Sequence, residues 1–316
     1  MRPFKLISWL LLCGTLAFMA ASAHAQTGRV PGRIVAAKVT GTVTAIDLAT
    51  QETRTLTTSD AVSQQTRIVT GANSSVILVF SNGASLNVGA DSSMDIEEFL
   101  QDPFQTEVAM ATLEAEPTSS TTSVRLTRGE LVGNVKKLNQ AGGSSFTVNT
   151  PVGAAGIRGT TFRIVFRPDA SGRVFFTLST AEGVVLFEAP AAEGVSVETG
   201  NEVAVSVDVT VDEATGTVTL NSAPTVEGLT QASPQALAAI EAAANDIVQA
   251  SAAVIISTSS SSTTDTGSPP QGSEQNPETK GEDNAKQSNL LKEQQSPVFG
   301  PTTPQTSTTP GDGKEE

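Results

Sequence analysis

Apolar and polar residues alternate along most of the chain, from Lys38 to about Ser222. A period of two is typical of β-strands that bury one face, and valine and threonine, which favour strands, are abundant. Turn residues separate the runs, and Asn82-Gly83 is a strong hairpin signal. The alternating runs include Leu86/Val88, Val124/Leu126, Phe146/Val148, Phe162/Ile164/Phe166 and Val203/Val205/Val207.

These short strands follow one another with no helical segment between them, which favours antiparallel over parallel sheets. The pattern therefore predicts an all-β domain over residues 38–223, folded as an antiparallel β-sandwich or β-roll. This length is sufficient for a hydrophobic core. The stretch 101–123 interrupts the alternation and is acidic and then rich in Thr and Ser, so we expect a long surface loop there.

The period changes after Pro224, and we interpret residues 224–256 as a linker followed by one amphipathic helix. Ser233 is a suitable N-cap, and Pro234 fits the first helical position. The apolar seam lasts barely three heptads, which favours docking on the β-domain over a coiled coil. Polar residues within the helix exclude a membrane span. The seam consists of Leu237, Ile240, Ala244, Ile247, Ser251 and Val254.

The N-terminus has the pattern of a secretory signal peptide over residues 1–25, and a short linker over 26–37 follows it. Two basic residues precede an apolar run, and Ala23-His24-Ala25 has the small-x-small form of a cleavage site. The alternative, lipidation at Cys13, lacks a small residue before the cysteine. We expect an exported protein, in the periplasm or at the cell surface, with no membrane span in the mature chain.

Residues 257–316 consist mostly of Ser, Thr, Pro, Gln, Gly, Glu and Lys. Such a composition cannot bury enough apolar surface to offset the entropy of ordering, so the sequence predicts a disordered tail. Its role could be that of a spacer or tether, of a site for sugar attachment, or of a solubilising segment.

Removal of the signal peptide leaves a chain with no Cys, His, Trp or Tyr. This excludes Cys or Ser–His nucleophiles, thiolate or imidazole metal sites and disulfides, so we predict no catalytic residue, no cofactor and no metal. Saccharides and single-stranded nucleic acid usually stack on aromatic platforms, and only Phe remains. The formal net charge of −14 disfavours nucleic acid and anionic membranes as partners, and we expect no small-molecule ligand.

Acidic residues cluster in the segment GADSSMDIEEF. Oxygen-rich clusters can bind Ca²⁺, but neither an EF-hand nor a glycine-rich nonapeptide pattern is present. A strand with one solvated face explains the alternation with Met94 and Ile96 better. Glu97 and Glu182 would form a glycosidase pair only if the fold brought them together, which nothing in the sequence indicates. The cluster comprises Asp91, Asp95, Glu97 and Glu98.

The stretch TPVGAAGIRGTTFRI contains three glycines at a spacing of three. A phosphate-binding loop would need another spacing and a following helix, whereas TTFRIVF has a strand pattern. We interpret the stretch as a corner between two sheets, where glycines permit positive φ or close backbone approach. Arg158 would pin this corner through its planar donors, so we expect Arg158→Ala to destabilise the fold. The structural motif comprises Thr150, Pro151, Gly153, Gly156, Arg158, Gly159, Thr160 and Phe162.

The same stretch resembles the FecR-type domain, in which a strand ending in T-P precedes a glycine-containing link and V/I-R-G-T-x-F. Other segments are similar to the family's I-x-T-G … A-x-L-x-F-x-D-G hairpin, with Asn82 where Asp is usual, and to its later glycine motifs. The resemblance covers residues 38–210. The matching segments are Ile68 to Gly71, Ser75 to Gly83, Leu126 to Leu131, Thr150 to Phe162, Ala181 to Val184 and Glu198 to Glu202.

The resemblance implies a non-catalytic, extracytoplasmic β-domain that engages another protein or an envelope component. The family's best-known members also carry a cytoplasmic anti-sigma segment and a membrane helix, and relay a signal from an outer-membrane transporter to a sigma factor. Here we expect a cleaved signal peptide and no anti-sigma segment. Our first hypothesis is a binding or scaffold module that recognises an envelope or surface protein through strand edges or loops. The alternatives are a signalling component that acts through a separate membrane partner, and a hydrolase that uses carboxylates alone.

Overall fold

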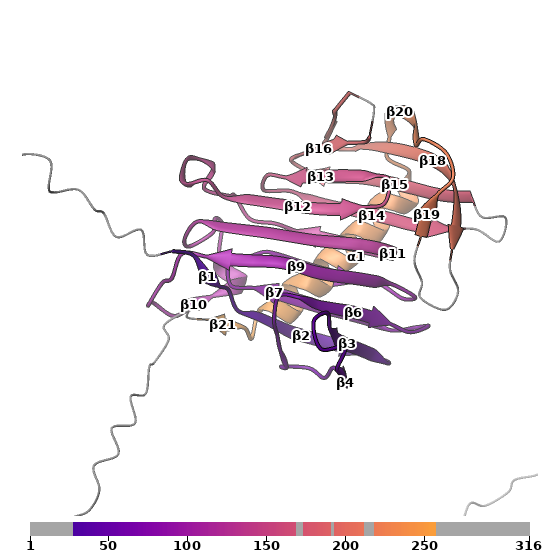
Figure 1. The fold of residues 1–316 in the computed structure, drawn as a ribbon. Helices are drawn as coiled ribbons and strands as arrows, with labels where there is room; N and C mark the ends of the chain where they lie inside the picture. The colour runs from indigo at the N-terminus through magenta and orange to yellow at the C-terminus, as the bar shows by residue number, and fades with distance from the viewer. Residues whose placement is uncertain (1–27, 169–172, 191–192, 212–217, 257–316) are drawn as a thin grey trace, which may run out of the picture. The chain divides into compact units, whose positions relative to one another are not determined.

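The computed structural model describes residues 28–168, 173–190, 193–211 and 218–256. The expected signal peptide and C-terminal tail lie outside these residues. Within them most strands are organised in two sheets, and a separate pair forms a small two-stranded sheet, which confirms the all-β, mostly antiparallel class predicted from the sequence (Figure 1). Of the strand pairs in the described ranges, only β11–β12 is parallel.

Nine strands of sheet A lie side by side in the order given next, and a tenth, β1 (Val30–Pro31), pairs with the end of β9 (Ser93–Gln101). The order is β4 (Thr53–Thr55), β3 (Val43–Asp47), β6 (Thr66–Thr70), β9 (Ser93–Gln101), β11 (Ser120–Asn134), β12 (Ser145–Thr150), β13 (Gly153–Ile157), β16 (Val184–Glu188) and β17 (Val195–Glu198).

Sheet B also contains β11, and β19 (Val218–Leu220) pairs with the far end of its strand β18. The spatial order is β5 (Ala61–Val62), β2 (Ile34–Thr40), β7 (Ser75–Phe80), β8 (Ser85–Val88), β11, β14 (Thr161–Pro168), β15 (Arg173–Glu182), β18 (Asn201–Val211) and β20 (Thr225–Gln231).

The long strand β11 belongs to both sheets. Its first part pairs with β9 in sheet A up to Arg128, and its second part, from Gly129, pairs with β14 in sheet B. Gly129 has φ +105°, and a Cβ atom built on it would lie 2.5 Å from Cα of Ser92. The change of sheet therefore takes place at a residue whose backbone conformation and surroundings both require glycine.

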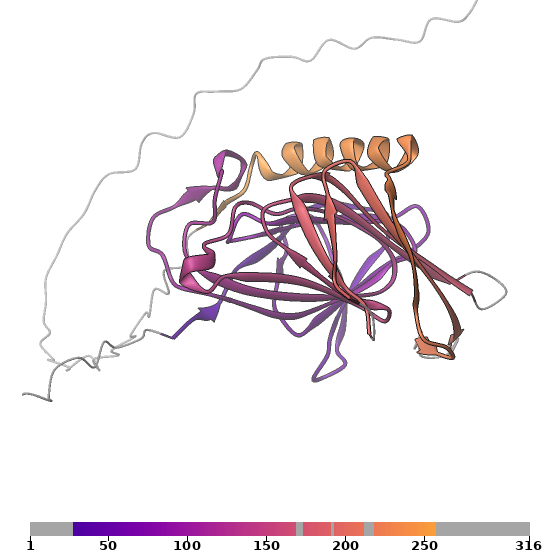
Figure 2. The same ribbon diagram turned by 90° about the horizontal axis from the view of Figure 1, so that it is seen from above.

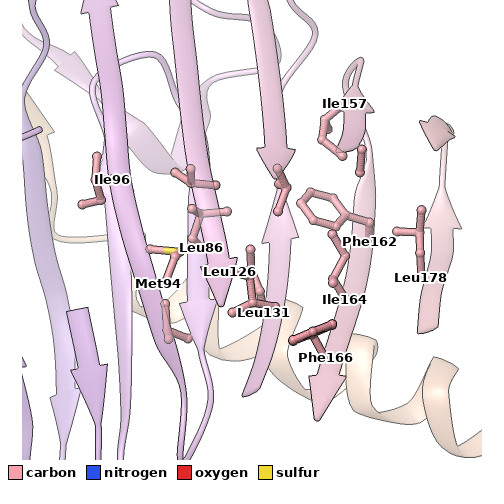
Figure 3. Packing of buried hydrophobic residues seen from close by; sticks show 14 of the residues in the cluster. Leu86, Met94, Ile96, Leu126, Leu131, Ile157, Phe162, Ile164, Phe166 and Leu178 are labelled. Atoms are coloured by element: carbon pink, nitrogen blue, oxygen red, sulfur yellow. The ribbon is translucent and has the colours of Figure 1, made fainter. Parts of the chain in front are cut away.

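The main core lies between the sheets and is formed by the inward-facing positions of the alternating runs (Figure 3). Phe176 of β15 stacks on Phe187 of β16 with ring centroids 4.9 Å apart, which joins sheet B to sheet A. Phe80 and Phe99 meet edge to face at 5.2 Å. Burying a side chain of this size contributes about 1.5–3 kcal/mol, so these contacts hold the two layers together.

The Asn82-Gly83 signal does form a hairpin, between β7 and β8. The loop closes through the Phe80–Ala84 backbone bond, with Gly83 at φ +87°. Asn82 is 1% exposed. Its side-chain nitrogen donates to Ser120 Oγ at 3.1 Å and Thr122 Oγ1 at 3.2 Å, so this turn residue also ties the hairpin to the start of β11.

The helix α1 (Pro234–Ser251) lies on the outer face of sheet B (Figure 2). Ser233 caps it, because its Oγ accepts a hydrogen bond from the Ala236 N–H at 3.1 Å. The predicted docking is confirmed, and the buried positions agree with the seam at Ile240, Ile247 and Ser251, with Ala236 buried as well. Below the helix, a second apolar cluster consists of Ile77, Val79, Met110, Ile247, Val254 and Ile256.

Two segments differ from the expectation. The stretch 101–123 is not a simple surface loop, because β9 and β11 extend into it and Met110 is buried. It also contains β10 (Val108–Ala109) and the 3₁₀ turn η1 (Met110–Thr112), and β10 pairs with β21 (Ile255–Ile256). The expected linker after Pro224 contains β20, which pairs with β18. The sequence did not predict β10 and β21 because strands of two residues show no period. It did not predict β20 because Gly228, at φ +96°, interrupts the alternation in that strand. A further 3₁₀ turn, η2, covers Gln140–Gly142.

Candidate functional site: the corner between the sheets

The glycine stretch runs from one sheet to the other. Strands β12 and β13 form a tight hairpin in sheet A, closed by a hydrogen bond from Thr150 Oγ1 to the Gly153 carbonyl at 2.8 Å, with Pro151 in its turn. The link 158–160 follows, and β14 then begins in sheet B, where Phe162 is fully buried. The link therefore lies at a corner between the sheets, whereas Gly153–Ile157, which the sequence analysis assigned to the corner as well, forms the strand β13.

Close packing determines the residue types in this link. Gly159 has φ +77°, and a Cβ atom on it would lie 3.1 Å from Cα of Lys137. A Cβ atom on Gly183, in the turn after β15, would lie 2.6 Å from Cγ2 of Thr160 and 2.8 Å from the Gly159 carbonyl oxygen. Two segments far apart in the sequence thus meet at the corner without room for a side chain. Gly156 differs, since its nearest neighbour would be the Leu186 carbonyl oxygen at 3.7 Å.

Hydrogen bonds fix the end of β11 against the same link. The Val135 N–H donates to the Thr160 carbonyl at 2.9 Å, and Asn134 Nδ2 donates to Thr161 Oγ1 at 3.0 Å. Thr160 is 2% exposed, and its hydroxyl has no hydrogen-bond partner among the described residues. The corner is therefore rigidly built and still contains an unsatisfied polar group.

A pocket of about 290 Å³ opens at this corner. It carries charges of both signs, from Lys136 and Lys137 and from Glu114 and Glu182. Leu113 adds an apolar contact, and the motif contributes Gly159 and Thr160. The full lining is Leu113, Glu114, Asn134, Val135, Lys136, Lys137, Gly159, Thr160, Thr161 and Glu182.

Arg158 does not pin the corner, which corrects the role expected for it. Its side chain is exposed and makes no ion pair or hydrogen bond with any described residue. The backbone of the link is instead held by Val135 and by the packing of the two glycines. A sequence shows that an arginine is present but not whether a carboxylate or carbonyl comes within its reach.

Among the residues that the structure describes, the cations without a partner lie at this corner. Lys136, Lys137 and Arg158 have no ion pair or side-chain hydrogen bond with the rest of the described chain. The other lysines and arginines of the described ranges each have an ion pair, a hydrogen bond or a related contact. The two lysines escaped the sequence analysis, although their adjacency directly after a long strand was a visible signal.

The acidic cluster serves a structural purpose on sheet A. Asp95 is paired with Arg67 through two hydrogen bonds of 2.6 and 2.9 Å. Partial burial alone would raise the pKa of Glu97, but hydrogen bonds from Ser123, Arg125 and Asn149 outweigh it and lower the pKa. Among the described residues, no three acidic, His or Cys side chains are grouped so as to hold a metal ion.

The imagined glycosidase pair is not assembled. Glu97 belongs to β9 in sheet A, whereas Glu182 ends β15 in sheet B and lines the corner pocket. Glu97 accepts hydrogen bonds from its own neighbours on β11 and β12.

No helix among the described residues combines the length and apolarity needed to cross a membrane.

Residues 66–186 match the family model described as FecR protein, a range that runs from β6 to β16 and includes the corner. This part of the chain is therefore similar to a FecR domain. FecR domains are typical of cell-surface signalling proteins, so the match supports a signalling-related, regulatory module.

Among solved structures, two crystal structures of a protein from Parabacteroides distasonis ATCC 8503, described as a candidate anti-sigma factor, are similar. Each shares 15% sequence identity with this chain, covers 50% of it with a TM-score of 0.32, and is itself covered over 59% of its length. This chain thus spans about three fifths of the length of those proteins. A search of curated proteins returned no match.

Proposed function

We propose that this chain is a non-catalytic, extracytoplasmic module that binds an envelope or surface protein through its FecR domain. The FecR match over residues 66–186 is the observation that carries the proposal. The corner pocket supports it, because it combines charged side chains that have no partner with a backbone held in place from three sides.

A second candidate function is a component of cell-surface signalling that acts through a separate membrane partner. The signalling context typical of FecR domains favours it. The two proposals share a protein partner and differ in its kind. A membrane transporter or membrane-bound regulator supports signalling, whereas an envelope scaffold protein supports a purely structural role.

The test is in-situ crosslinking of the full chain in the cells that produce it, followed by mass spectrometry. We expect one exported or membrane protein to be enriched over an unrelated exported control. Mass spectrometry of the mature N-terminus tests export, with a start near Gln26 as the expected result. Failure to enrich any protein at several crosslinker lengths would refute a binding role.

A matched pair of variants tests the remaining enzymatic alternative. Glu97→Gln removes the hydrogen-bonded carboxylate of sheet A, and Glu182→Gln removes an exposed carboxylate of the pocket. If the chain were a hydrolase that used Glu97 and Glu182 as its two carboxylates, these folded variants would lose the activity. We expect no hydrolysis of glycoside or peptide substrates by the parent chain or by either variant.

A further inference from the structure

We propose that the corner pocket binds a short segment of a partner protein that presents an isolated carboxylate, held by Lys136 and Lys137 of the pocket lining and by Arg158, which adjoins the lining residue Gly159. This inference rests on the proposed function and deepens it. It specifies where on the FecR domain the partner binds and which side chain of the partner is recognised.

The distribution of charge is the first argument. The chain is acidic, with a formal net charge of −14, so cations are scarce and nearly all of those described are used within the fold. The three exceptions adjoin one another, because Lys137 packs against Gly159 and Arg158 precedes that glycine. Cations left unpaired in an acidic protein are available to an acidic group from outside, and such complementarity steers association.

The pocket provides the second argument. About 290 Å³ is space for one or two side chains rather than for a whole domain, so it fits a short segment. Leu113 offers an apolar wall beside the lysines, which suits a residue next to the partner's carboxylate.

The two glutamates of the lining restrict the ligand. Glu114 and Glu182 would repel a second negative charge close to the first. They therefore disfavour polyanions such as nucleic acid or clustered phosphates, and select a lone carboxylate with neutral or basic neighbours.

The unpaired hydroxyl of Thr160 is an independent observation at the same place. It is buried at the base of the link that carries Arg158, where native structures normally supply a partner. Together with the unpaired cations, it marks the corner as a site that lacks a hydrogen-bonding partner.

The experiment uses a photo-crosslinking amino acid at Leu113, inside the pocket, in the full chain produced in its own cells. The same amino acid at Val248, which is 64% exposed on α1, reports on binding elsewhere. The corner variant carries Lys136→Gln, Lys137→Gln and Arg158→Gln. The control variant removes three cations at scattered sites, through Lys38→Gln, Arg128→Gln and Arg173→Gln, and changes the net charge equally. Far-UV circular dichroism melts verify that both variants fold.

We expect position 113 to capture a protein at a segment with one Asp or Glu flanked by uncharged or basic residues. The yield of the crosslinked product should fall about tenfold in the corner variant, because the loss of a few ion pairs of modest strength has a combined effect of this size. The yield should remain unchanged in the control variant. High salt should reduce the yield in the parent chain, because these charges lie at the surface.

Other outcomes overturn the inference and differ in what they leave standing. Capture at position 248 without capture at 113, or a yield at 113 that the corner variant does not reduce, refutes the site and retains the protein-binding function. A crosslink from 113 to residues 257–316 of the same chain shows that no partner protein occupies the pocket. Absence of any captured protein refutes the site and the binding function together.

Discussion

Substitution of Gly129 by alanine tests the way in which β11 passes from one sheet to the other. The residue has φ +105°, which costs an alanine about 1–3 kcal/mol. The new Cβ atom would lie 2.0 Å from Ser92 Oγ and 2.5 Å from Ser92 Cα, so the backbone of a buried strand end must move. Overpacking of this kind adds about 1–3 kcal/mol. We expect a loss of about 3–5 kcal/mol, a large part of the 5–15 kcal/mol typical of a domain.

Two other glycines separate the contributions of backbone conformation and crowding. Gly200 has φ +80° with nothing within 4 Å of a built Cβ, so Gly200→Ala should cost only about 1–2 kcal/mol. Gly156 lies in β13 without a positive φ, and the nearest atom would be 3.7 Å away. Gly156→Ala should therefore be neutral or stabilise by up to about 1 kcal/mol, since it restricts the unfolded chain.

The assay is urea unfolding at equilibrium, followed by far-UV circular dichroism because the described residues contain no Trp or Tyr. The transition midpoints should decrease in the order Gly156→Ala, Gly200→Ala, Gly129→Ala, with similar m-values. Equal midpoints for Gly129→Ala and Gly200→Ala would show that contact with Ser92 contributes nothing, and the reasoning about the sheet crossing would fail.

Three further predictions concern named contacts. Arg158→Ala should change the free energy of unfolding by less than about 0.5 kcal/mol in urea titrations, because the side chain has no partner among the described residues; a loss above about 1 kcal/mol would restore the pinning role. Asn82→Ala should lower the free energy of unfolding by about 2–3 kcal/mol, because Ser120 and Thr122 stay buried after losing its hydrogen bonds. The control Asn221→Ala removes only an exposed hydrogen bond to Thr210, so equal effects of the two variants would contradict this prediction. The pKa of Glu97 is lowered in the folded chain, so the ionised carboxylate stabilises the fold above the unfolded-state pKa near 4.3. This stabilisation is lost as the pH falls through the lower folded-state pKa, and the parent chain should therefore lose more stability on acidification than Glu97→Gln. Parallel curves of stability against pH for the two proteins would refute this prediction.

The sequence predicted those parts of the fold that depend on local chemistry. Alternation identified strands in both sheets, Asn82-Gly83 identified a hairpin, and Ser233-Pro234 identified the start of the helix. Each of these signals acts within a few residues, through side-chain period, turn geometry or capping. The short pair β10–β21 and the irregular strand β20 are stabilised by partners distant in the sequence, so local patterns did not reveal them.

The candidate site was predictable only in its backbone. The glycine stretch indicated a corner, and the structure has one there. Which charges remain without a partner depends on how the end of β11 packs against the link 158–160, and no spacing rule in the sequence encodes that. The same limit explains the wrong role for Arg158 and the omission of Lys136 and Lys137.

At the corner, some residues pack the fold and others remain available to a partner, which explains why a FecR match indicates the fold more readily than the partner. Gly159 and Gly183 are fully committed to packing the link against its neighbours, so they have little left to offer a ligand. The charged groups that remain available are Arg158 and the side chains of Lys136 and Lys137, and the motif does not specify the two lysines. Recognition should therefore follow the charges at the corner rather than its glycines, and exchanging those charges should alter the partner while leaving the stability of the domain intact.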